Sequence, residues 1–345
     1  MGGGSFYKFI NKDIKELNGI IVSLFSVLFL VGVGFISYKI SNSYALFGDS
    51  ITGSKTIEVE ASTPLSGAET IIEKVGTGGL EEIIHEADST LQIGTTSDIT
   101  EYRYRGSNPD NYVTFNDEIW RIIGVFPTDD GTENIENRIK IIRNELVGFY
   151  PWNDCNNNDY NSTCDDNEKN INDWTGSTLN MYLNEDYYSS LTNNAKNMID
   201  NVKYYLGGYH TATIAKEEMY IYERKISGTE YYFGNNPNST INKIGLIYIS
   251  DYGYAASDDC AEVLSRYDDI SCTSNNWLYT GEYEWLLTHE VSQDYTFIFD
   301  IRSSGGIALD MFNIETMVRP VLYLSSDVMI SGGIGTSSDP YILSK

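Results

Sequence analysis

Hydrophobic and polar positions divide the chain into three blocks. Residues 18–38, "NGIIVSLFSVLFLVGVGFISY", are apolar, and no charged residue lies between Glu16 and Lys39. Ser, Thr, Gly and Glu dominate residues 41–100, whereas aromatic and β-branched residues become frequent from Glu101 onward. The pattern predicts a short N-terminal segment, an apolar helix, a stalk or linker and one large domain. We place these parts at residues 1–17, 18–38, 39–100 and 101–345.

The apolar block is long enough to cross a membrane. About 20 uncharged residues in a helix span a bilayer core of about 30 Å. Lys8, Lys12 and Lys15 precede the block and favour an N-terminus inside the cell. A signal-peptide core is shorter, which favours an uncleaved anchor, although Ser43 and Ala45 leave cleavage open. We therefore expect a single-pass membrane protein whose C-terminal domain lies outside the cell.

The linker contains two short amphipathic patterns. "ETIIEKV" at 69–75 and "LEEIIHEA" at 80–87 each predict a short helix, and the glycines of "GTGG" at 76–79 separate them. Because few aromatic residues occur in this block, we expect no core of its own here.

The large domain alternates between strand and helix patterns. "NYVTF" and "EIWRIIGVF" predict a hairpin that turns at Asn116–Asp117, and "RIKIIR" predicts a half-buried strand. Residues 173–199 change to a helical period and predict two short helices joined near residues 184–186, with Thr175 or Ser177 as the first N-cap. Later strands are expected in "KIGLIYIS", "YTFIFDI", "GIALDM" and "MVRPVLYL". The fold class is therefore α+β, strand-rich with a helix pair.

Export changes how the four cysteines are interpreted. Outside the cell an even number of cysteines predicts disulfide bonds, and three pairings are possible. We favour the local pairing, Cys155 with Cys164 and Cys260 with Cys272, which closes two short polar loops. Zinc is disfavoured because the chain has no CxxC pair and its three histidines, His85, His210 and His289, are distant from the cysteines in sequence.

Sequence motifs for catalysis and metal binding are weak. "THEVSQ" at 288–293 lacks the second histidine of a zinc protease, and "DCNNND" at 154–159 lacks the glycine and the final glutamate of a calcium-binding EF-hand loop. We therefore predict no cofactor, and we leave calcium at the Asn/Asp-rich loop open. The net charge of −26 disfavours nucleic acid and anionic lipid as partners.

Several segments together carry a resemblance. They are "NYVTFNDEIWRIIGVF", "IKIIRNE", "WTGSTLNMYLN", "GLIYISDYGYA", "NWL" and the closing "VRPVLYLSSDVMISGGIGTSSDPYIL". This ordered set resembles a family of uncharacterised surface proteins from gut Firmicutes. That family is similar to the C-type-lectin-like group, which includes formylglycine-generating-enzyme-like domains and retroelement variable proteins. The resemblance implies a C-type-lectin-like domain and supplies no catalytic residues, because no reactive cysteine pair of the formylglycine-generating type can be matched.

Tyr, Trp, Asn, Ser and Gly are concentrated in the expected loops. This composition is typical of recognition loops, because tyrosine offers contact area at low entropy cost and Asn and Ser adapt their hydrogen bonds. The sequence thus predicts a membrane-anchored extracellular binding or adhesion module for a glycan or protein ligand. The alternative is an exported hydrolase of glycans or cell walls that uses carboxylates. The predicted contact residues are Trp152, Tyr160, Tyr209, Tyr232, Tyr252 and Tyr254.

Overall fold

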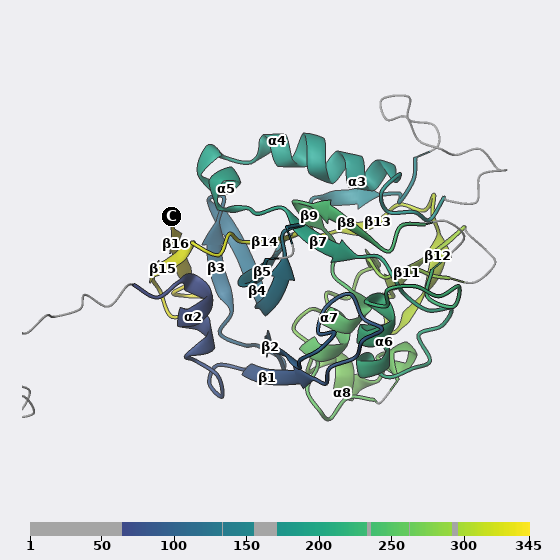
Figure 1. Ribbon diagram of the computed structural model, residues 1–345, viewed down its shortest axis with the longest axis horizontal. Helices are drawn as coiled ribbons and strands as arrows, with labels where there is room; N and C mark the ends of the chain where they lie inside the picture. Colours follow the sequence, from purple (N-terminus) through teal and green to yellow (C-terminus); the bar gives the residue numbers. More distant parts are fainter. Residues whose placement is uncertain (1–63, 133, 155–170, 233–235, 262, 292–295) are drawn as a thin grey trace, which may run out of the picture. The chain divides into compact units, whose positions relative to one another are not determined.

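The computed structural model describes residues 64–345, except residues 133, 155–170, 233–235, 262 and 292–295. The described residues belong to one compact unit, Pro64–Lys345. Strands make up much of its regular structure, and long loops and short helices connect them (Figure 1). The domain is therefore strand-rich and of the α+β type, as the sequence predicted.

The predicted single-pass membrane topology is not supported. Across the described ranges, no helix combines the length and the apolar character that a bilayer crossing requires. The hydrophobic residues of these ranges are instead distributed over short strands and helices that pack against each other. The segment 18–38, on which the prediction rested, lies outside the described residues. We therefore withdraw the localisation at the membrane.

Among the described residues, the main sheet has nine strands, in the order β15-β16-β3-β4-β5-β14-β9, and β2 pairs with β4 and carries β1 at its other edge. The strands are β1 (Leu80–His85), β2 (Ile99–Tyr104), β3 (Tyr112–Phe115), β4 (Glu118–Asp129), β5 (Ile135–Arg143), β9 (Ile244–Gly245), β14 (Val321–Tyr323), β15 (Met329–Gly332) and β16 (Tyr341–Ser344). Most neighbours are antiparallel, but β16 runs parallel to β3.

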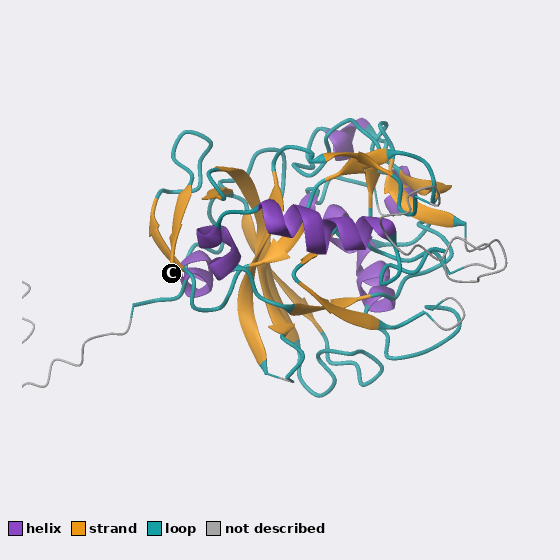
Figure 2. Ribbon diagram, turned by 90° about the horizontal axis from the view of Figure 1, so that it is seen from above, coloured by secondary structure: helices purple, strands orange, loops and turns teal. Residues whose placement is uncertain are grey.

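A second sheet has five strands in the order β12-β11-β10-β13-β6. They are β6 (Gly148–Tyr150), β10 (Glu284–Trp285), β11 (Phe297–Ile301), β12 (Ile307–Met311) and β13 (Thr316–Val318), and β7 (Val202–Tyr205) pairs separately with β8 (Ser239–Asn242). The helices are α2 (Gly67–Ile72), α3 (Thr178–Tyr182), α4 (Tyr188–Ser190), α5 (Asn193–Met198), α6 (Lys216–Glu223), α7 (Ile249–Ala255) and α8 (Ile270–Thr273). Figure 2 shows how the helices lie between and beside these strands.

The predicted hairpin is confirmed. β3 and β4 pair directly across Asn116 and Asp117, whose φ angles are 54° and 61°. A two-residue turn of this type needs positive φ at both central residues, and Asn and Asp tolerate that conformation better than most side chains. The strand predicted at "RIKIIR" is confirmed as the second half of β5.

The described part of the predicted stalk belongs to the domain. Ile71 and Leu80 are fully buried in its core, so residues from 64 onward are not a separate linker. The expected helix at "LEEIIHEA" is instead the strand β1, which pairs residue by residue with β2 from Leu80↔Tyr104 to His85↔Ile99. A local helical pattern has thus been overridden by hydrogen bonds to a distant segment.

The predicted pair of helices is present, but the first helix ends at a different position from the one predicted. Ser177 caps α3, since its hydroxyl accepts from the Asn180 amide at 3.1 Å. The helix then continues through a π-helical turn, Leu183–Tyr187, into α4, and the break falls at Leu191–Thr192. The junction predicted near residues 184–186 is therefore wrong, because the buried side chain of Leu183 and the Asn184 amide hold this turn against Ile244.

The strand predicted at "KIGLIYIS" is present only as the two residues of β9, and a helix begins before the segment ends. Only the two residues of β9 pair with β14, and α7 begins at Ile249. The carboxylate of Asp251 accepts from the Tyr248 amide at 3.0 Å, which satisfies a free N–H at the start of the helix.

The local pairing of two cysteines is confirmed. A disulfide joins Cys260 to Cys272 and closes the loop that precedes and includes α8. Cys155 and Cys164, and most of the Asn/Asp-rich loop considered for calcium, lie outside the described residues.

Candidate ligand-binding site

Two of the predicted contact residues belong to the core. Trp152 is buried against Trp174, with ring centroids 5.1 Å apart. Tyr252 is fully buried, and its hydroxyl donates to the Gly305 carbonyl at 2.9 Å. Neither ring is available at the surface, because each packs inside the domain. Tyr160 lies outside the described residues.

Tyr209 and Tyr232 lie elsewhere, on a group of tyrosines beside α6. Tyr209 is partly exposed, and its ring packs on Tyr222 at 4.6 Å, whose ring packs on Tyr231 at 5.0 Å. The neighbouring Tyr232 is buried and donates its hydroxyl to the Lys225 carbonyl. The rings of Tyr209, Tyr222 and Tyr231 therefore pack in a row of tilted pairs.

Tyr254 is the predicted residue that lines a substantial cavity. The cavity has a volume of about 630 Å³ and opens between β1, the loop after it, α6 and the end of α7. Its size lies within the usual range for small-molecule sites. The lining residues are Ile83, Ile84, His85, Glu86, Ala87, Asp88, Leu91, Arg105, Lys216, Glu217, Tyr220, Ile221, Tyr254 and Asp258. The site is therefore apolar and aromatic with a charged rim.

Three rings from three elements form the aromatic wall of the cavity. His85, at the end of β1, stacks on Tyr220 of α6 with centroids 3.6 Å apart and planes 4° apart. Tyr254, from α7, meets His85 edge-on at 5.9 Å. Because Tyr220 covers one face of the imidazole, the side chain of His85 retains 12% exposure on the cavity side.

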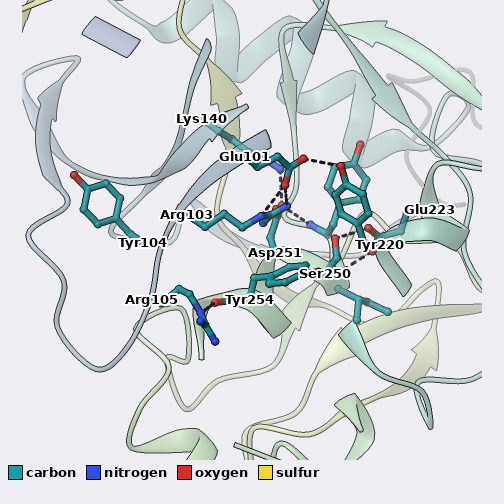
Figure 3. Close-up of polar contacts among 12 residues, drawn as sticks. Glu101, Arg103, Tyr104, Arg105, Lys140, Tyr220, Glu223, Ser250, Asp251 and Tyr254 are labelled. Carbon is teal, nitrogen blue, oxygen red and sulfur yellow. Dashed lines mark hydrogen bonds and ion pairs between the residues drawn. The ribbon is translucent and has the colours of Figure 1, made fainter. Parts of the chain in front are cut away.

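A buried carboxylate holds this wall from behind. Glu101 of β2 accepts from the Tyr220 hydroxyl at 2.8 Å and from Arg103 Nε at 2.8 Å, and its Oε2 lies 3.3 Å from His85 Nε2 (Figure 3). Residues two apart on a strand share a face, which places Glu101 beside Arg103. One side chain thus fixes both rings of the stack.

The contacts continue into the core through a chain of ions. Arg103 Nη1 donates to Asp251 at 2.8 Å, and Lys140 donates to the other oxygen of the same carboxylate (Figure 3). Burial alone would raise the pKa of Asp251, but Lys140 and Arg103 hold that pKa below its ordinary value. This buried network holds the elements behind the aromatic wall together.

The same balance determines the protonation of Glu101. Burial opposes ionisation, but the Arg103 guanidinium and the hydrogen bond to His85 hold the pKa of Glu101 well below its ordinary value. Glu101 is therefore an ionised acceptor and a poor proton donor. Burial raises the pKa of Glu223, but its carboxylate is bound by Ser250 and Thr288 and does not line the cavity.

Two cations, Arg105 and Lys216, line the cavity, and they differ in how closely carboxylates pair with them. Arg105 is paired with Glu81 and Asp258, and its Nε donates to the Tyr254 carbonyl at 3.0 Å. Lys216 forms an ion pair with Glu217 at a longer N···O distance of 3.8 Å. Figure 3 shows Arg105 directly beside Tyr254.

Sequence reasoning missed His85, Lys216 and Tyr220 as site residues. His85 was placed in a helix of the stalk, and only its pairing with β2 brings it next to Glu101. A signal was present in the alternation around Ile83 and His85, which is compatible with a strand.

Metal binding finds no support in the described ranges, where no three His, Cys, Asp or Glu side chains lie close enough to hold an ion. Comparison of the sequence with family models gave no match. Comparisons with curated proteins and with solved structures likewise gave no match. The assignment of a function therefore depends on the chemistry of the cavity.

Proposed function

We propose that this chain is a glycan-binding module and that one sugar ring of the glycan enters the cavity. The observation that carries the proposal is the imidazole of His85, which is stacked on Tyr220 and lines a preformed cavity. The C–H face of a pyranose packs on such a ring, and its hydroxyl groups require charged or polar partners around it. The charged rim of the cavity provides such partners.

The same cavity gives less support to the alternative function, hydrolysis of glycans. Glycoside hydrolysis uses two carboxyl groups, one of which has a raised pKa and donates a proton. The buried carboxylate next to the cavity, Glu101, has a lowered pKa and accepts hydrogen bonds from Arg103 and Tyr220. This arrangement favours binding over acid catalysis.

We also propose that the domain is C-type-lectin-like, in keeping with the resemblance of the sequence. In support, "VRPV" at 318–321 joins β13 to β14, and the helices α3 to α5 precede it in the chain. In this structure β13 belongs to the five-stranded sheet and β14 to the nine-stranded sheet. An experimentally determined structure in which either strand belongs to another sheet would contradict this proposal.

Binding of glycans by the purified full-length protein tests the proposed function. A glycan array would identify candidates, and calorimetry would measure the affinity of each. His85→Ala should weaken binding at least tenfold, because it removes the ring on which the sugar packs. His210→Ala is the matched control, since His210 is exposed and lies beside Tyr209 instead of the cavity. Equal binding by wild type and His85→Ala would exclude the cavity as the site.

A further inference from the structure

We infer that the sugar bound in the cavity carries a carboxylate, which lies between the Lys216 ammonium and the Tyr254 hydroxyl. This inference rests on the proposed function and makes it more specific, because it names a sugar acid, such as a hexuronic acid, as the recognised residue. Three groups that lack a hydrogen-bond partner within the described part of the chain carry the argument.

The first group is the Lys216 ammonium. Its side chain is 16% exposed, and the carboxylate oxygen of Glu217 with which it pairs lies 3.8 Å from Nζ, which is too far for a hydrogen bond. The Nζ atom lies 5.6 Å from the centroid of the Tyr254 ring. Burial lowers the pKa of Lys216, which reflects the cost of holding this charge away from water. A bound anion would offset that cost.

The second group is the Tyr254 hydroxyl. Tyr254 is 3% exposed and lines the cavity, and no described residue forms a hydrogen bond with its hydroxyl. Burial raises the pKa of this hydroxyl, so it stays protonated and can donate. The hydroxyl is therefore free to donate to a ligand in the cavity.

The third group is the second nitrogen of His85. Nε2 faces the ionised Glu101 and donates to it, so Nδ1, which has no partner in the described ranges, is an acceptor for a sugar hydroxyl. The ring of His85 is 5.9 Å from that of Tyr254, and Lys216 Nζ lies 5.6 Å from the Tyr254 ring. Lysine and tyrosine both donate, and these two donors match the two oxygens of a carboxylate.

Other cations near the cavity are already neutralised. Arg105 is bound by two carboxylates, and Lys225 is bound by Asp88 and by the Thr90 hydroxyl. Lys216 is thus the cation of the described lining that has no hydrogen-bonded carboxylate. Its backbone position is tightly set, because α6 packs closely on α7 at Gly253.

A carboxylate fits better than a phosphate. One lysine and one hydroxyl supply few donors, whereas phosphate sites usually combine arginine with several backbone amides. The exposed carboxylate of Glu217 lies beside Lys216, and the chain has a net charge of −26. A second negative charge on the ligand would therefore be repelled.

Calorimetry with two disaccharides tests this inference. One probe ends in glucuronic acid and the other in glucose at the same position. We expect the full-length protein to bind the acidic disaccharide at least tenfold more tightly. Lys216→Met should abolish this preference, because it removes the charge that distinguishes the two probes. Lys225→Met removes the same charge from a lysine that is already paired, so it should retain the preference.

The outcomes separate this inference from the proposed function. Equal binding of the two disaccharides, or a tenfold preference that persists in Lys216→Met, would overturn the inference and leave glycan binding intact. Failure of both disaccharides and of every glycan on the array would overturn both. Circular dichroism of each variant would show whether the fold is retained, and Lys216→Arg should keep part of the preference.

Discussion

Glu101 accepts hydrogen bonds from both Arg103 and the Tyr220 hydroxyl, each at 2.8 Å. These two bonds connect the wall of the cavity to the ion pairs of the core. Removal of the carboxylate charge would leave Arg103 with less compensation inside the protein, and buried ion pairs are costly to break.

Glu101→Gln should therefore lower the free energy of unfolding by about 3 kcal/mol. Glu118→Gln is the matched control, because the Glu118–Arg143 pair is partly exposed and should contribute at most about 1 kcal/mol. Denaturant unfolding measures both values. Equal losses in the two variants would show that burial of the Glu101 network does not determine its contribution.

Tyr220→Phe should cost about 1 kcal/mol and preserve ligand binding. The change removes the hydrogen bond to Glu101 but keeps the ring on which His85 stacks. Calorimetry and denaturant unfolding on the same sample distinguish the two effects. A large loss of affinity with unchanged stability would mean that the hydroxyl contacts the ligand.

Gly253→Ala should disturb the lysine at the rim of the cavity. A Cβ at this position would lie 2.6 Å from the Cβ of Lys216 and 2.9 Å from Leu264, so α6 and α7 would have to separate. We expect a loss of about 1–3 kcal/mol in stability, together with weaker binding of the acidic disaccharide. Thermal unfolding and calorimetry test the two parts of this prediction, and unchanged values in both would contradict it.

Asp300 should make stability depend on pH. Burial raises its pKa to about 7, with Asp310 acting in the same direction and Arg302 opposing both. Because the folded-state pKa lies above the unfolded value of about 4, the ionised folded form is disfavoured. Stability attributable to Asp300 is therefore complete below about pH 4, declines as pH rises to about 7, and changes little above that.

Asp300→Asn should remove this decline, so that the variant is a few kcal/mol more stable than wild type at pH 8 and similar to it at pH 4. Asp339→Asn, at an exposed position, should behave as wild type. Urea unfolding across this pH range provides the measurement. Parallel curves for wild type and Asp300→Asn would contradict the assignment.

Replacement of both Cys260 and Cys272 by Ser should lower stability by about 2–3 kcal/mol, since the bond closes a loop with a sequence separation of 12. The second predicted bond, between Cys155 and Cys164, is a separate prediction. Mass spectrometry of a non-reducing digest would identify both pairs. Free thiols at Cys155 and Cys164, or a peptide joining either to Cys260 or Cys272, would refute it.

Local signals in the sequence predicted local structure well. The Asn116–Asp117 turn, the Ser177 cap and the Cys260–Cys272 bond each depend on residues close together in the chain. The strand β1 was missed because its partner β2 determines its conformation, and the sequence between them carries no signal of that pairing.

The candidate site was harder to predict for the same reason. Tyrosines in polar segments suggested exposed recognition loops, yet Tyr252 is buried with its hydroxyl satisfied by a carbonyl. Composition cannot distinguish such a residue from Tyr254, whose hydroxyl reaches a cavity. The difference arises from long-range packing that brings β1, α6 and α7 together.

The position of β16 has a consequence for synthesis of the protein. This strand is inserted between β15 and β3, and Tyr341 is buried there in register with Val113. The strand β3 therefore lacks its neighbour β16 until residues 341–344 have left the ribosome. Ribosome-bound nascent chains should thus expose an unpaired edge at β3 throughout most of translation, and chaperones that recognise extended segments would find it there.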